Sequence, residues 1–213
     1  ALNDVRADFL VSQVEGVSPD EVANLITALR QSKAESVSAL EAAVENAAGG
    51  QNWRHQARLA ILGLHLDAPT LAREMCQLRA DPIRRTIFID EIRTWHGELD
   101  TLAKLATGMA DIPFRSALLL GVGSIPGTEV VPAAKDAWLS LATSWYTSGP
   151  DILTHSSAGW LLRTWDAEVP VIASSEGPAD GQNWYVNSVG MTLLQIPSGS
   201  FIRKVPNARV NAP

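Results

Sequence analysis

The chain has 213 residues, a formal net charge of −6 and a sequence pI near 5.2. This acidic balance, with no cluster of Lys and Arg, argues against nucleic acid as the main partner and against a basic membrane-surface patch. The longest apolar run, residues 117–122, is too short to cross a bilayer, so no membrane insertion is expected. The single cysteine, Cys76, excludes an internal disulfide and a cysteine-rich metal site, and its apolar context predicts a buried, unreactive thiol.

The length leaves room for one large domain or one and a half. Because the sequence begins with Ala1 rather than Met and has no signal peptide, we interpret it as a processed or excised piece of a longer protein. The compartment therefore stays open, with a slight preference for the cytoplasm, and so does the oligomeric state.

The N-terminal part is predicted to form three helices. Residues 2–14 have the spacing of an amphipathic helix, and Ser18-Pro-Asp-Glu21 is a capping box that predicts a second helix ending near Arg30. Residues 36–48 form the third, ended by Gly49-Gly50. The apolar faces of the first two helices are expected to consist of Val5, Phe9, Leu10 and Val14, and of Val22, Leu25, Ile26 and Leu29.

Short capped helices are predicted from Asn52 onward. Asn52, Asp67-Ala-Pro69 and Asp81-Pro82 each begin a helix, because a polar cap and an early proline favour helix starts. Further helices are expected at 98–107, 111–122, 132–146 and from Pro150-Asp151 to about Trp165, with a loop at 123–131. The inward residues are expected to be Ala57, Ile61 and Leu64; Leu71, Met75, Cys76 and Leu78; Ile83, Ile87, Phe88 and Ile92; and Trp138 and Leu141.

Seven tryptophans are the main aromatic feature of the chain. A carbohydrate-binding surface is one interpretation. Core packing is favoured, because most of them share helix positions with apolar neighbours. The tryptophans predicted to pack in the core are Trp95, Trp138, Trp145, Trp160 and Trp165.

One pattern recurs in the segments 51–62, 81–92, 111–122 and 151–162. Each opens with a polar capping residue and has Arg or His four positions later, at His55, Arg85, Arg115 and His155. Starts spaced by 30 to 40 residues are typical of stacked helical hairpins. We expect the Arg or His column to form a structural ladder with Asp residues of neighbouring repeats, with ligand binding as the alternative.

The character changes after Trp165. Residues 169–173 are expected to be extended or irregular, and residues 174–182 form a polar linker. Residues 184–186 and 191–196 are predicted to be two short strands joined by a turn at Asn187-Ser-Val-Gly190. The tail 204–213 is expected to be loosely held.

No reactive constellation stands out. The histidines His55, His65, His96 and His155 show no i, i+4 pair, and His96, Glu98 and Asp100 are read as turn and cap residues rather than a metal site. The glycines of 121–127 lack the Gly-Lys-Ser/Thr of a phosphate loop. The pairs Asp20-Glu21 and Asp90-Glu91 are placed on solvent faces. We therefore assign no catalytic, cofactor-binding or metal-binding residue and expect no cofactor.

The segment from Trp184 to Phe201 resembles the N-terminal hairpin of the formylglycine-generating sulfatase-modifying domain. That hairpin reads Asn-Ser-x-Gly-Met, an apolar strand, then Ile-Pro-x-Gly-x-Phe. The residues that carry the resemblance are Asn187, Ser188, Gly190, Met191, Ile196, Pro197, Gly199 and Phe201. The resemblance implies that the family's catalytic cysteines, the non-haem iron centre of some relatives and the calcium ligands lie further downstream, so none is expected among these residues.

The preceding segments Arg115–Gly121 and Asp151–Trp165 resemble the helical-repeat region found ahead of this domain in large bacterial proteins, many of which also carry a Ser/Thr kinase. The two resemblances together cover roughly residues 15–201. They imply a HEAT-like repeat domain joined to the start of a sulfatase-modifying-type domain.

We therefore expect an all-α, HEAT/armadillo-like right-handed stack of helical hairpins over residues 1–166, a linker over 167–182, and a truncated β-hairpin with its tail over 183–213. The expected function is a non-catalytic scaffold that binds a protein partner or spaces the flanking domains. The alternatives are the regulatory arm of a formylglycine-generating or related oxidoreductase, with or without an upstream kinase, and nucleic-acid binding, which the acidic balance disfavours.

Overall fold

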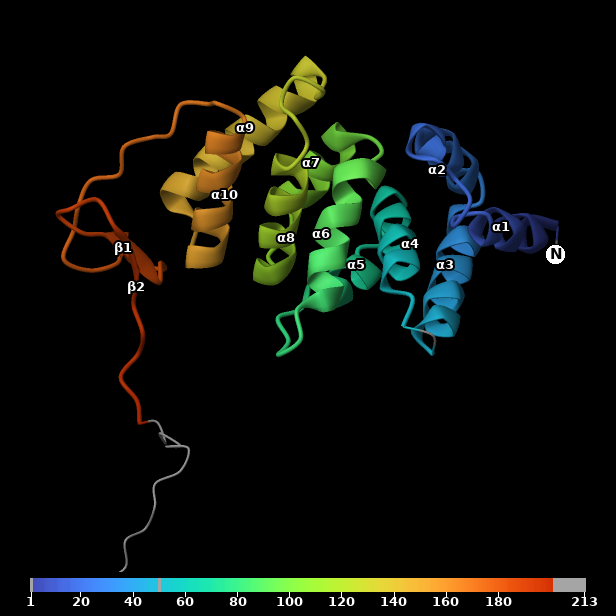
Figure 1. The fold of residues 1–213 in the computed structure, drawn as a ribbon, viewed down its shortest axis with the longest axis horizontal. Helices are drawn as coiled ribbons and strands as arrows, with labels where there is room; N and C mark the ends of the chain where they lie inside the picture. Colours follow the sequence, from blue (N-terminus) through green and yellow to red (C-terminus); the bar gives the residue numbers. More distant parts are fainter. Residues whose placement is uncertain (1, 50, 201–213) are drawn as a thin grey trace, which may run out of the picture.

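A computed structural model describes residues 2–49 and 51–200 of the chain. Within these residues the fold is all-α, with ten α-helices, one short 3₁₀ helix and a small two-stranded antiparallel sheet (Figure 1). The expected fold class is confirmed at this level. The elements are α1 (Leu2–Ser12), η1 (Pro19–Glu21), α2 (Val22–Arg30), α3 (Lys33–Ala48), α4 (Trp53–His65), α5 (Thr70–Cys76), α6 (Ile83–Trp95), α7 (Leu99–Thr107), α8 (Ile112–Gly123), α9 (Pro132–Ser148), α10 (Ile152–Thr164), β1 (Trp184–Val186) and β2 (Thr192–Leu194).

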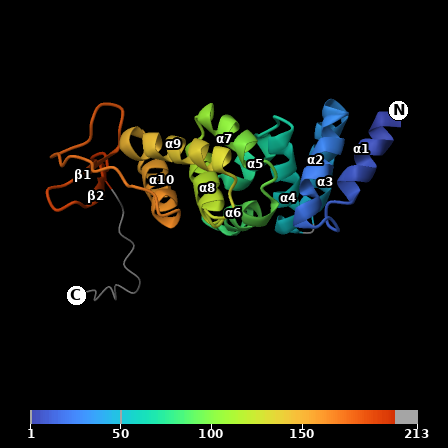
Figure 2. The same cartoon turned by 90° about the horizontal axis from the view of Figure 1, so that it is seen from above.

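The helices lie in two layers along one axis. The helices α3, α4, α6, α8 and α10 form a row in which each packs against the next. The helices α5, α7 and α9 form the second layer, which packs along one side of this row, as the view from above shows (Figure 2). Helix α1 lies at one end of the molecule and the β-hairpin lies at the other (Figure 1).

Helix starts follow the capping residues of the sequence. The side chains of Asn52, Asp111 and Asp151 accept hydrogen bonds from the backbone N–H three residues later, at 3.2, 2.9 and 2.7 Å. The Glu21 carboxylate accepts from the Ser18 backbone N–H at 3.1 Å, which completes the predicted capping box. Such caps supply partners for N–H groups that the helix itself leaves free.

The core contains most of the predicted apolar residues. Trp95 and Trp138 are fully buried, and Trp165 is nearly so. The indole N–H groups of Trp138 and Trp165 donate to the carbonyls of Leu99 and Ile125, so these two donors are paired, whereas the buried indole N–H of Trp95 has no hydrogen-bond partner among the described residues. Trp160 departs from the prediction because it lies on the surface, 37% exposed.

Three other inward predictions are wrong. Phe9 is 62% exposed, because α1 is the last helix of the array and packs on one side only, against α2 and α3. Leu78 is 61% exposed, because α5 ends at Cys76 and the extended backbone at Gln77 turns the next residue out. Ile83, at the first residue of α6, is 44% exposed. The side chain of Val5, the residue Phe201 and the tail 204–213 lie outside the described part.

The predicted ladder of basic and acidic residues has one rung. Arg115 of α8 forms a buried ion pair with Asp151, the cap of α10, at 2.9 Å. Arg85 instead donates to the Ser116 hydroxyl at 2.9 Å. The acid that Arg85 was expected to reach, Asp111, pairs with Arg73 of α5 at 3.3 Å. The prediction that an ion pair links the repeats is therefore wrong between α6 and α8.

The C-terminal hairpin packs against the end of the array. Trp184 is 2% exposed and its indole N–H donates to the Gly149 carbonyl at 2.7 Å. Asn183 accepts through its side chain from the Ile152 backbone N–H at 2.9 Å. The two predicted strands pair in antiparallel register, with Trp184 opposite Leu194. Residues 169–182 contain no helix or strand, as expected for a linker.

We predict that Asp151→Asn lowers the free energy of unfolding by about 3 kcal/mol, because it leaves the buried Arg115 without a counter-charge while keeping an oxygen for the cap. The matched variant Asp111→Asn removes a cap charge paired with the half-exposed Arg73, and should cost about 0–1 kcal/mol. Urea unfolding followed by circular dichroism measures both. Equal losses would contradict the assignment of Arg115–Asp151 as the stabilising rung.

Candidate functional site

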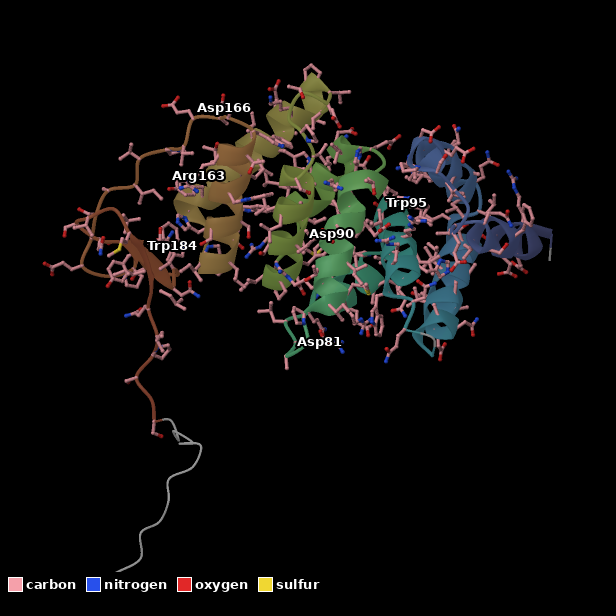
Figure 3. The ribbon with its side chains drawn as sticks, in the orientation of Figure 1. Asp81, Asp90, Trp95, Arg163, Asp166 and Trp184 are labelled. Atoms are coloured by element: carbon pink, nitrogen blue, oxygen red, sulfur yellow. The ribbon has the colours of Figure 1, made fainter. Side chains whose placement is uncertain are left out.

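A surface groove of about 660 Å³ lies on the face of the row. It crosses four consecutive helices of the row, α4, α6, α8 and α10. Asp90, labelled in Figure 3, lies on α6 near the middle of this face. The groove is lined by Arg54, Arg58, Ile89, Asp90, Glu91, Arg93, Thr94, Leu120, Ser124 and Trp160.

Glu91 organises the α4–α6 end of the groove. Its side chain is 7% exposed and its two oxygens contact two guanidinium groups, Arg54 at 2.9 Å and Arg58 at 2.8 Å. Arg58 also lies over the Trp95 ring, 4.8 Å from its centroid. The prediction that Glu91 lies on a solvent face is therefore wrong. The single negative charge of Glu91 is shared by two guanidinium groups, so this cluster of three side chains has a net positive charge.

Two charged side chains of α6 face the groove without an internal ion pair. Asp90 and Arg93 are exposed, and no ion pair within 4.0 Å involves either of them among the residues that the structure describes. Their charges are therefore available to a molecule that enters the groove.

The α8–α10 end of the groove is apolar. Leu120 is partly buried and Trp160 is 37% exposed, which is unusual for so large an apolar side chain. The Trp160 ring lies over Gly123, where an added Cβ would come within 2.6 Å of the ring. A side chain at this position would collide with the indole, so the glycine leaves room for it.

Asp90, Leu120 and Trp160 occupy the same place in three copies of the repeat, nine residues after Asp81, Asp111 and Asp151. The equivalent residue of the first copy, Ala60, is fully buried. Three residues of the groove lining thus come from one column of the repeat, which differs from the Arg and His column singled out from the sequence. The sequence does contain a sign of this column: the ninth residue after the capping Asp is charged in one copy, at Asp90, and apolar in the next two, at Leu120 and Trp160.

The Arg and His column has structural contacts. The His155 ring is stacked between Tyr146 and Trp184, with ring centroids 4.6 and 3.7 Å away. Its Nδ1–H donates to the Tyr146 carbonyl at 2.7 Å, which leaves Nε2 to accept from the Thr192 hydroxyl at 3.2 Å. Burial is the main cause that lowers the pKa of His155. This histidine joins the hairpin to the array.

His65, His96, Glu98 and Asp100 take part in separate contacts. The Nε2–H of His65 donates to the His96 carbonyl at 2.8 Å, Glu98 pairs with Arg30 at 3.1 Å, and Asp100 pairs with Lys104. In the described part of the chain, no group of three or more His, Cys, Asp or Glu side chains is arranged to hold a metal ion.

The remaining candidates have packing roles. Gly121 lies inside α8, where an added Cβ would come within 2.6 Å of Ile92, and Gly127 lies against the Trp165 ring. Cys76 is fully buried, as predicted, and burial raises the pKa of its thiol well above the usual value.

Comparisons with protein-family models, with curated proteins and with solved structures found no match to the chain. Among the described residues, no helix is both long enough and apolar enough to span a membrane. The site must therefore be interpreted from its own geometry.

His65 should make stability depend on pH. Burial lowers the pKa of His65 from 6.5 to about 4, because a charged ring would place an N–H at the buried and unpaired Nδ1. The unfolded chain then binds more protons between pH 6.5 and 4, so the free energy of unfolding falls as the pH drops through this window. We predict that, between pH 7 and pH 4.5, the free energy of unfolding of His65→Gln falls by about 2–3 kcal/mol less than that of the wild type.

Urea unfolding at the two pH values measures this difference. His155→Gln serves as the comparison, because its pKa is lowered in the same direction while both of its ring nitrogens have hydrogen-bond partners. An identical loss in wild type and His65→Gln would show that His65 is not the group responsible.

Proposed function

We propose that the chain is a non-catalytic, HEAT-like scaffold that binds a protein partner in the groove across α4, α6, α8 and α10. The observation that carries the proposal is the groove itself, in which an exposed tryptophan and unpaired charges lie on one continuous helical face. Exposed aromatic and arginine side chains in a hollow are the residue types that contribute most to protein binding. The row of like-oriented repeat helices supports the HEAT-like description.

The mixed character of the lining favours a protein over a small molecule. Small-molecule sites are mostly apolar and enclose the ligand. This groove is open and has charged side chains from α4 and α6 at one end and apolar side chains from α8 and α10 at the other. A polypeptide presents both kinds of group along its length.

A second proposal is that the array is the regulatory arm of an oxidoreductase of the sulfatase-modifying type. The packing of the hairpin against α10 through Trp184 and His155 favours it, because this contact would fix the orientation of a domain that continues from the hairpin. In that case the groove would bind a regulatory partner, and Trp184→Ala would alter activity of the parent protein without altering binding in the groove.

The scaffold proposal predicts that the double variant Trp160→Ala with Arg93→Glu captures at least about tenfold less of a protein that the immobilised wild-type chain retains. The first change removes an apolar anchor from the groove, and the second reverses an unpaired charge. Affinity capture from an extract of the source cells, quantified by mass spectrometry, measures this.

The control variant is Leu78→Ala with Lys104→Glu. It removes an exposed apolar side chain and reverses an exposed charge outside the groove, where Leu78 is 61% and Lys104 80% exposed. It should retain the partner. A set of captured proteins that is the same for all three chains would refute the groove as the binding face.

A further inference from the structure

We propose that the segment bound in the groove is an acidic peptide with apolar side chains, whose carboxylate contacts the α4–α6 end and whose apolar residues contact Leu120 and Trp160. This inference rests on the proposed function and adds the chemistry of the partner. It follows from the uneven distribution of charge and apolar surface along the groove.

Charge complementarity selects a carboxylate. The lining contains three guanidinium groups, on Arg54, Arg58 and Arg93, and two carboxylates, on Asp90 and Glu91. Glu91 is already shared by Arg54 and Arg58, and Arg54 remains 70% exposed. The groove is therefore locally positive in a chain whose net charge is −6. A basic segment would be drawn to the rest of the surface instead, whereas an acidic one is attracted here.

The second feature of the partner is apolar. The Trp160 ring of α10 lies against Gly123, and Leu120 lies one helix nearer to α6. Removal of these apolar surfaces from water favours binding. A partner with only acidic residues would leave both uncovered, so the peptide needs apolar side chains at this end.

The helix spacing sets the distance between the two features. Packed helices lie about 8–10 Å apart, so Leu120 is roughly 9 Å and Trp160 roughly 18 Å from Arg93 across the row. An extended chain advances about 3.3–3.6 Å per residue. The expected partner therefore has an Asp or Glu followed or preceded by apolar residues about three and about five to six positions away.

The test is selection of peptides from a displayed random library of about twelve residues, which spans the groove in extended form, against the full immobilised chain. Enriched peptides should contain Asp or Glu at the stated distance from an aromatic or aliphatic residue. Fluorescence anisotropy with one such peptide should show binding weakened about tenfold by Arg93→Glu and about tenfold by Trp160→Ala, each equivalent to about 1.4 kcal/mol, with Lys104→Glu unchanged.

A charge swap makes the assignment specific. Replacing the acidic residue of the peptide by Lys should weaken binding to wild type and strengthen binding to Arg93→Glu. Peptides that need Trp160 but carry no acidic residue would refute this inference and leave the proposed function standing. No enriched peptide, or peptides that bind all variants equally, would refute both.

Discussion

Close approach between neighbouring helices is the constraint on which this structure depends. Gly121 of α8 faces Ile92 of α6, and Gly159 of α10 faces the Tyr146 ring of α9, each with room for no more than a hydrogen atom. The residues Ala57, Ala117 and Ala158, at or next to the same place in their copies, are fully buried. Small residues at these positions let the backbones come together, so each helix buries its stripe against the next one rather than against a separate core.

The groove follows from this packing. One side of each helix packs against the neighbouring helices. The column of residues next to that side therefore faces the outside of the row. Asp90, Leu120 and Trp160 lie in that column and therefore line up across three helices. The neighbouring column is buried, with Gly121 and Leu161 in two copies, and Glu91 occupies the same place in α6. A carboxylate at a buried place requires counter-charges, which Arg54 and Arg58 provide.

Local chemistry explains how much could be predicted. Helix starts at Asn52, Asp111 and Asp151 were predictable because a cap satisfies the N–H groups beside it, and the strands around Asn187-Gly190 were predictable from their turn residues. Side-chain environment was harder, because it depends on neighbours distant in the sequence. Trp160 has the sequence pattern of a core residue, and only the packed structure shows that it lies on the surface, 37% exposed. Glu91 has the pattern of a solvent residue, and only the two arginines of α4 reveal its burial.

The same comparison bears on how the groove selects a partner under the proposed function. In a regular stack every repeat offers an equivalent external position, and identical residues there would form a uniform surface with no preferred partner. This chain has an acid, an aliphatic side chain and an indole at that position in successive copies, bordered by an over-compensated buried carboxylate. The order of these groups along the row is fixed by helix packing, so under the proposed function a partner must match both their chemistry and their spacing. In the proposed function, specificity is therefore a property of the repeat column, because the packed helices hold these groups in a fixed order.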